Sequence, residues 1–188
     1  KEIQFPHGMV DTGENVTNVE LVYAGQEVEV TETFTSFYNQ RQKALVTLNK
    51  VLEQDETFGI GMNGEISAVT FGLYAQEDIT AADGSVIPAD GLLEIVSVNE
   101  NGQAICSTDL PFGSFYLKEL STDSHYLPSG ETFPFTFEFG GPSIAVVEIS
   151  ANDGETVTNE LIRGEIKGLK TDENGTGLGG AVIGLFKS

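Results

Sequence analysis

The chain has 188 residues and a formal net charge of −20, from 9 Lys and Arg against 29 Asp and Glu. A surface this acidic repels nucleic-acid phosphates and anionic lipid headgroups, so we expect neither a nucleic acid nor a membrane as partner. The single cysteine excludes an internal disulfide, and with only two histidines the chain offers no cysteine–histidine zinc site. We therefore predict no metal and no cofactor.

Alternation of apolar and polar residues dominates the sequence, and no stretch carries the apolar stripe of an amphipathic helix. Six segments are predicted strands: 44–52, 66–74, 92–98, 113–120, 132–139 and 144–149. Five pairs suited to tight hairpin turns punctuate them: Asn63-Gly64, Asp83-Gly84, Asn101-Gly102, Asp153-Gly154 and Asn174-Gly175. The sequence therefore predicts an all-β fold, a meander or Greek-key β-sandwich.

Two stretches of the sequence resemble each other. Residues 39–50 (NQRQKALVTLNK) and 159–170 (NELIRGEIKGLK) both begin with Asn and end with Lys, and the second follows the first by 120 residues (159 − 39). Each is followed by a similar apolar run, AVTFGLY or AVIGLF. Strand segments of similar composition can match by chance, but the shared spacing favours a tandem array with this period.

The repeat divides the chain into three predicted parts. Residues 43–163 form one complete β-sandwich. Residues 1–42 are the C-terminal strands of a preceding repeat, and residues 164–188 are the N-terminal strands of the following repeat.

Three polar residues alternate in phase with apolar neighbours on their strands. Lys50 is in phase with Leu48, Glu119 with Leu117, and Asn159 with its own apolar neighbours two positions away, so all three are predicted to point into the core. Burial of a lysine, a glutamate and an asparagine is costly unless they contact one another. The pattern therefore predicts that these three side chains meet.

The run GSFYLKELSTDSHYLPSGETFPFTF (113–137) resembles the Glu-containing box of Cna-B-type repeat domains, which occur in Gram-positive surface adhesins and pilins. VTLNK (46–50) and TVTNELIRG (156–164) are similar to the family's other two signatures, and residues 168–186 resemble the start of a fresh repeat. The resemblance covers the complete unit and both flanks. It implies a Greek-key sandwich of the prealbumin-like or immunoglobulin-like kind.

The family resemblance also implies a spontaneous isopeptide bond between a lysine and an asparagine, promoted by a buried acid. Carried over to this sequence, Lys50 is the nucleophile, Asn159 the electrophile and Glu119 the catalytic acid. Because burial favours the neutral forms of amines and carboxyls, a neutral lysine can attack while the acid polarises the carboxamide carbonyl and relays protons. Each molecule reacts once, so the chain is not an enzyme in the usual sense.

Each of the three residues also has an ordinary interpretation. Lys50 can be a strand-end lysine whose amine reaches water. Glu119 is a solvated edge residue if the register slips by one, and Asn159 can serve a turn. Their agreement in phase, chain order and repeat spacing favours the cross-link.

The flanks carry two further candidates that lack partners for a bond of their own. Asn39 is the predicted acceptor of the preceding repeat, and Lys170 is the predicted nucleophile of the following one. Because exposed strand edges seek partners, one hypothesis is that residues 164–188 of one molecule exchange strands with residues 1–42 of another.

The resemblance implies a structural stalk or fibre module of an extracellular, cell-wall-anchored surface protein, with neighbouring repeats as partners. The alternative is an adhesin module whose loops 53–65 and 75–91 bind a host protein or glycan, for which Phe58 and Met62 are the candidate contacts. A hydrolase with paired carboxylates is disfavoured because no separable acid and nucleophile pair is evident.

Overall fold

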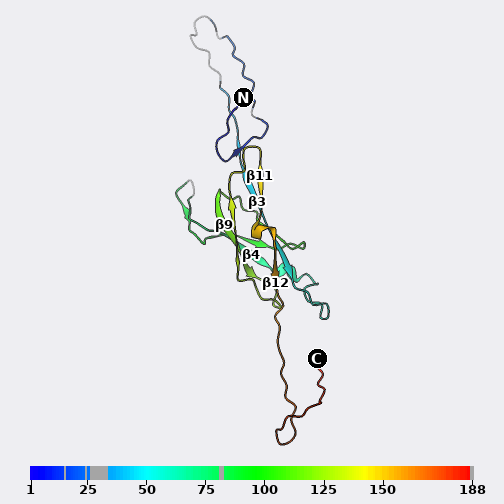
Figure 1. Cartoon of the computed structure of the whole chain (residues 1–188). Coiled ribbons are helices and arrows are strands. Elements are labelled where there is room, and N and C mark those ends of the chain that lie inside the picture. The colour runs from blue at the N-terminus through cyan, green and yellow to red at the C-terminus, as the bar shows by residue number, and fades with distance from the viewer. Residues whose placement is uncertain (15, 24, 26–33, 81–82, 187–188) are drawn as a thin grey trace.

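The structure is a computed structural model, and it describes residues 1–14, 16–23, 25, 34–80 and 83–186. Parts of the predicted flanks and of loop 75–91 thus lie outside the described residues. The described chain contains two four-stranded sheets, two short strand pairs and two single-turn 3-10 helices. Figure 1 shows the strands of the sandwich gathered in the middle of the molecule. The predicted all-β class is confirmed.

One sheet has the strand order β10–β9–β4–β7, with every neighbouring pair antiparallel. Its strands are β10 (Thr132–Phe137), β9 (Gly113–Ser121), β4 (Thr70–Ala75) and β7 (Leu92–Ser97). Alternate side chains of β10 face inward, and Phe133, Phe135 and Phe137 are all buried. The sequence predicts that the period-two stripe of Phe133, Phe135, Phe137 and Phe139 belongs to the core; this is confirmed for the first three, whereas Phe139, beyond the end of β10, is only partly buried.

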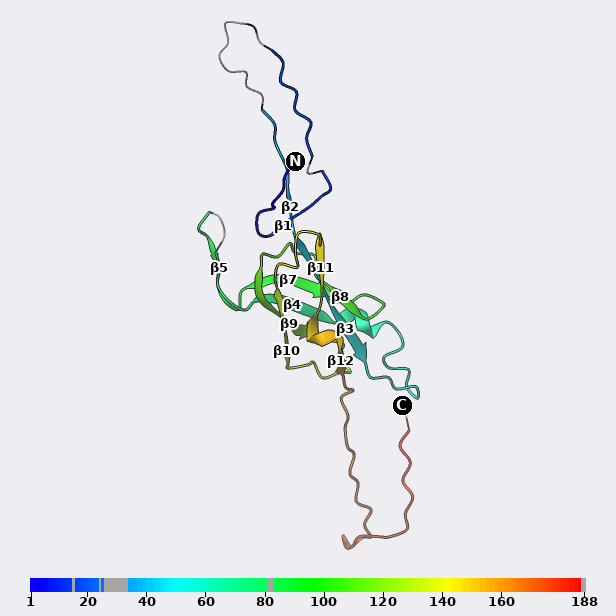
Figure 2. The same cartoon turned by 45° about the horizontal axis from the view of Figure 1, so that its top comes forward.

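The other sheet is built around β3 (Lys43–Leu52). Strand β8 (Gln103–Ile105) pairs antiparallel with one edge of β3. On the other edge β11 (Val146–Ser150) and β12 (Thr156–Asn159) follow each other, and both run parallel to β3. Figure 2 shows β3 between these neighbours.

This parallel pairing corrects the prediction of a tight hairpin turn at Asp153-Gly154. The pair lies in the 3-10 helix η2 (Ala151–Gly154), where Asn152 and Asp153 both have positive φ values, 58° and 53°. The chain leaves the edge of β3 after β11, makes this single turn, and returns to the same edge in the same direction as β12.

A second correction concerns the predicted strand 66–74. Gly64, at φ 88°, leads the chain into the 3-10 helix η1 (Glu65–Ala68), so β4 begins only at Thr70. The short strand pairs are β1 (Met9–Val10) with β2 (Gln40–Arg41), and β5 (Ile79–Thr80) with β6 (Val86–Ile87).

The core lies between the two four-stranded sheets. Val46 and Leu48 of β3 belong to the same buried cluster as Phe71 and Leu73 of β4 and Leu117 of β9. Cys106 is also buried there, and burial raises the pKa of its thiol to about 12. The sandwich interior is therefore where any inward-pointing polar side chain must find a partner.

The two ends of the chain extend from opposite ends of the sandwich in both views (Figures 1 and 2). Residues 164–186 contain a single isolated bridge, Thr171 with Gly177, and large apolar side chains such as Ile166 and Leu169 are exposed along them. None of the helices in the described ranges has the length and apolar character needed to span a membrane.

Candidate functional site

Lys50 lies on β3 and faces the core. Alternation along β3 buries Val46, Leu48 and Lys50, and the lysine is only 1% exposed. Its backbone N–H donates to Gly102 O at 2.7 Å. Gly102 has φ +74°, and a Cβ added there would lie 2.4 Å from Lys50 O, so only glycine fits this close to the strand.

Glu119 and Asn159 reach the same place from different sheets. Glu119 lies on β9, in phase with the buried Phe115 and Leu117, and is 5% exposed. Asn159 ends β12 and is 1% exposed, two positions after the buried Val157. The predicted inward orientation of all three polar side chains is confirmed.

The three side chains are in contact. Lys50 Nζ donates to Asn159 Oδ1 at 2.5 Å, and Asn159 Nδ2 donates to Glu119 Oε1 at 2.6 Å. Lys50 Nζ lies 3.7 Å from Glu119 Oε2. The fold thus brings Asn159 into contact with Lys50, which is 109 positions away in the chain, and with Glu119, which is 40 positions away.

The environment favours the neutral amine of Lys50. Burial lowers the pKa of Lys50 from its ordinary value, and the nearby Glu119 carboxylate opposes this shift. Because desolvation is the larger of the two effects, the net direction is downward. A lysine with a lowered pKa has a larger fraction of its amine available as a nucleophile at neutral pH.

The hydrogen bond between Asn159 and Glu119 differs from the predicted one. The family resemblance implies an acid that polarises the carbonyl of Asn159, whereas Glu119 accepts from the amide nitrogen. The carboxyl group therefore lies beside the nitrogen that would leave as ammonia, and Lys50 lies beside the carbonyl oxygen. In this arrangement Glu119 can hand a proton to the leaving nitrogen.

Sequence reasoning missed two further contacts of the site. Thr122 Oγ1 accepts a hydrogen bond from Asn159 Nδ2 at 3.0 Å, and the backbone N–H of Ser129 donates to Glu119 Oε2 at 2.8 Å. Both residues follow β9 in an irregular segment, where strand alternation gives no signal. Together they hold the carboxamide and the carboxyl group in place.

A buried glutamine, also missed, ties the start of β3 to the loop before β11. Gln42 is fully buried, and its Nε2 donates to Gly141 O at 3.0 Å and to Ile144 O at 2.5 Å. Its Oε1 accepts from Gly140 N at 2.8 Å. Gln42 thus satisfies three backbone groups and fixes the approach of β11 to β3.

The two flank candidates have other surroundings. Asn39 Nδ2 donates to Glu2 Oε1 at 2.9 Å, a contact that strand alternation does not predict. Lys170 is exposed in the extended segment after residue 163. Within the described ranges, no group of three or more His, Cys, Asp or Glu residues could hold a metal ion.

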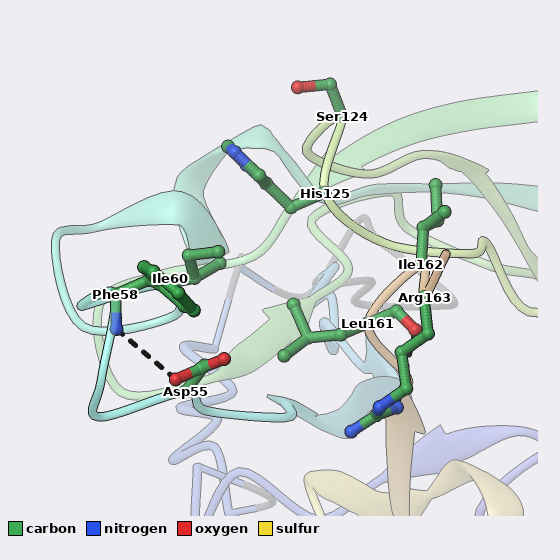
Figure 3. Close-up of a pocket in the computed structure, with 8 residues that line it drawn as sticks. All are labelled: Asp55, Phe58, Ile60, Ser124, His125, Leu161, Ile162 and Arg163. Atoms are coloured by element: carbon green, nitrogen blue, oxygen red, sulfur yellow. Dashed lines mark hydrogen bonds between the residues drawn. The ribbon is translucent and has the colours of Figure 1, made fainter. Parts of the chain in front are cut away.

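A surface pocket of about 400 Å³ lies beside the loop 53–65 (Figure 3). Phe58, which is 68% exposed, stands at its edge, where its backbone N–H donates to Asp55 Oδ1 at 3.3 Å. Met62 is also exposed but does not line the pocket. The remaining lining residues are Ile60, Ser124, His125, Leu161, Ile162 and Arg163.

No family profile and no curated protein matches the sequence. Among solved structures, the chain is similar to the Bacillus anthracis TIE protein, at 20% identity and a TM-score of 0.43, over 86% of this chain and 24% of that one. It is also similar to GBS52, the minor pilin of Streptococcus agalactiae, at 17% identity and a TM-score of 0.40, over 71% of this chain and 51% of that one.

A third match is BcpA, the major pilin subunit of Bacillus cereus, at 16% identity and a TM-score of 0.35, over 63% of this chain and 29% of that one. The chain thus spans between about a quarter and a half of the length of these proteins. Two of these three proteins are pilins. At such low identity, the function of this chain has to be argued from its own side chains.

Proposed function

We propose that residues 43–163 form a structural stalk or fibre module of a Cna-B type, from a Gram-positive cell-surface protein, closed by an autocatalytic isopeptide bond between Lys50 and Asn159. The observation that carries the proposal is the contact of three buried polar side chains between the sheets, with Lys50 Nζ 2.5 Å from the Asn159 carboxamide. Burial of a lysine, a glutamate and an asparagine lowers stability unless their polar groups contact one another.

The proposed reaction exchanges one amide for another. A bond forms between Lys50 Nζ and Asn159 Cγ, the bond from Cγ to Nδ2 breaks, and Nδ2 leaves as ammonia. The proton that Lys50 releases is relayed through Glu119 to the leaving nitrogen, which already donates to Glu119 Oε1 at 2.6 Å. No oxidant or cofactor is needed, and the fold supplies the proximity that lets an unreactive amide react.

A covalent link of this kind suits a protein outside the cell. The single cysteine cannot form an internal disulfide, whereas an amide bond between side chains is independent of redox conditions. The high negative charge keeps neighbouring modules soluble and apart. The partners that follow from this role are adjacent repeats of the same polypeptide, and the location is the cell surface or cell wall.

Intact-mass spectrometry of the purified, denatured chain tests the proposal. We expect the chain to be lighter than its sequence mass by one ammonia, and peptide mapping to join the Lys50 peptide to the Asn159 peptide. The Glu119→Ala variant should have its full mass, whereas Glu131→Ala, at an exposed position, should keep the deficit. A full sequence mass for the unaltered chain would rule the cross-link out.

The pocket beside Phe58 supports a second candidate function, an adhesin module that binds a host protein or glycan through its loops. An exposed aromatic ring at the edge of a partly apolar hollow is a common feature of ligand sites. Binding to a glycan array and to immobilised extracellular-matrix proteins tests it. Phe58→Ser should abolish any binding that Leu127→Ser, an exposed apolar position outside the pocket, leaves intact.

A further inference from the structure

An open groove lined by aromatic rings lies where β10 ends and β9 begins, at the paired residues Phe137 and Gly113. Its volume is about 520 Å³, and His7, Phe112 and Phe139 line it together with that pair. Phe137 is fully buried, whereas Phe112 and Phe139 are partly exposed. The core therefore leaves part of two phenylalanine rings available to a ligand.

These rings are held in place by their neighbours. The ring centroids of Phe112 and Phe137 are 4.7 Å apart, and those of Phe112 and Phe139 are 6.2 Å apart. The His7 ring lies 4.8 Å from the Phe139 ring. Gly8 has φ +84°, and a Cβ added there would lie 2.8 Å from the Phe112 ring, so glycine allows this close approach. The groove is thus formed before a ligand binds, which lowers the entropic cost of binding.

Phe112 also lines a second hollow. This hollow has a volume of about 220 Å³, and Phe112 and Gly113 belong to both linings. The chain is anchored just before Phe112, because Arg41 Nη1 donates to Leu110 O at 2.9 Å and the Arg41 guanidinium pairs with Asp109. Leu110 itself is 1% exposed. The two hollows therefore share one fixed aromatic residue.

The hollows carry negative charge. Glu138 lines the first, and Glu77 and Asp78 line the second, whereas within the described ranges no lysine or arginine lines either. Asp78 Oδ1 accepts from Ala89 N at 2.8 Å. The carboxylates of Glu77 and Glu138 have no ion pair or hydrogen bond to any described residue. On a chain with a net charge of −20, these carboxylates attract cations and repel anions.

We propose that these two hollows form a cation groove (Phe112, Phe139, Glu77 and Glu138), which binds the arginine or lysine side chains of a basic peptide segment in a partner protein. A cation over the face of an aromatic ring is attracted by the ring quadrupole, and a carboxylate beside the ring adds an ion pair. Arginine suits the groove best, because its planar guanidinium stacks on a ring while its N–H groups reach a carboxylate.

This site is separate from those already described. It shares no lining residue with the pocket beside Phe58. The inference also stands without the proposed isopeptide bond, because Lys50, Glu119 and Asn159 do not line the groove. The cation groove would give the module a lateral contact with a basic partner, in addition to a structural role.

Titration of the isotope-labelled full chain with a short peptide, followed by NMR, tests the proposal. The probe is a blocked glycine–serine peptide that contains two arginines. The control is the same peptide with citrulline in their place, which keeps the shape of the side chain but carries no charge. We expect the arginine peptide to shift the backbone amide signals of Phe112, Gly113 and Glu138, and the citrulline peptide to leave them in place.

Substitutions separate the groove from the overall negative charge. Glu138→Gln and Phe139→Leu should each weaken binding of the arginine peptide by roughly two- to fivefold, as expected for an exposed ion pair or cation–π contact. Glu131→Gln removes the same charge at an exposed position outside the groove and should leave the affinity nearly unchanged. Phe139→Tyr keeps the ring face and should bind as the unaltered chain does.

Three results would overturn the inference: equal shifts with the citrulline peptide, an equal loss of affinity in Glu131→Gln and Glu138→Gln, or an equal loss in Phe139→Tyr and Phe139→Leu. The second of these would assign the attraction to the net charge of the chain. The amide spectrum of each variant without peptide checks its fold. Glu138→Gln changes an exposed side chain and carries the test if the leucine variant does not fold.

Discussion

The side chain of Asn159 joins the two sheets of the sandwich to each other, because its amide nitrogen donates to Glu119 Oε1 at 2.6 Å. Asn159 ends β12 in the mixed sheet, and Glu119 lies on β9 in the antiparallel sheet. The hydrogen bond therefore crosses the core rather than following a strand pair. The proposed cross-linking reaction takes place at this crossing point.

Glu119→Gln should lower the free energy of unfolding by about 5 kcal/mol, if the glutamate catalyses the bond between Lys50 and Asn159. Closing a loop of 109 residues restricts the unfolded chain, and the chain-entropy treatment of disulfides gives about this value. Chemical denaturation of the variant and of Glu131→Gln, an exposed control, measures the difference. Equal denaturation midpoints for the two variants would contradict the expectation.

Thr122→Val should slow the cross-linking reaction by roughly tenfold, since it removes the hydroxyl that accepts a hydrogen bond from Asn159 Nδ2 at 3.0 Å. The reaction is followed as the loss of ammonia with time after refolding. Thr122→Ser retains the hydroxyl and should react at nearly the original rate. A serine variant as slow as the valine variant would assign the effect to packing instead.

The rate of cross-linking after refolding should rise with pH and level off below pH 10.5, the ordinary pKa of a lysine amine. Burial lowers the pKa of Lys50, so the neutral amine predominates from a lower pH than in a free lysine. Between the lowered pKa and 10.5 the unfolded state binds more protons than the folded state, and the stability of the unreacted fold therefore rises with pH. A rate that still climbs through pH 10.5 would show that Lys50 titrates as an exposed lysine.

Gln42→Leu should lower the free energy of unfolding by about 3 kcal/mol, because it leaves Gly140 N, Gly141 O and Ile144 O without their side-chain partner. Gln40→Leu, at an exposed position on β2, is the matched control and should change stability little. Thermal and chemical denaturation give both values. A similar loss in the two variants would argue against the buried network.

Gly102→Ala should destabilise the chain much more than Gly175→Ala. Both glycines have positive φ, +74° and +82°, and an alanine in that region costs about 1–2 kcal/mol. A Cβ on Gly175 meets nothing within 4 Å, whereas one on Gly102 would lie 2.4 Å from Lys50 O. The difference between the two unfolding free energies isolates the steric contact, and equal losses would show that β3 simply moves aside.

The sequence predicts the candidate site well because strand alternation carries the information. Lys50 shares the phase of Val46 and Leu48, and side chains of one phase enter one core. The alternation also predicts the burial of Phe133 and Phe137 correctly. Alternation with a period of two is a property of a single strand, so it can be recognised in the sequence without knowing which strands pair with each other.

Features that depend on distant neighbours were missed. Thr122 lies in an irregular segment, and only the position of Asn159 in space gives it a role. The direction of β12 relative to β3 depends on three consecutive residues of positive φ in η2, Asn152, Asp153 and Gly154, and these residue types in a turn are equally compatible with a hairpin.

The parallel pairing of β3 with β12 has a mechanical consequence. Tension that enters at residue 43 and leaves beyond residue 159 pulls the two strands along their length in opposite directions, so their hydrogen bonds are loaded together in shear rather than one after another. With Lys50 bonded to Asn159, the load would cross from one strand to the other at that point. Residues 51–158, which contain most of the core, would then lie outside the load path and remain folded under tension.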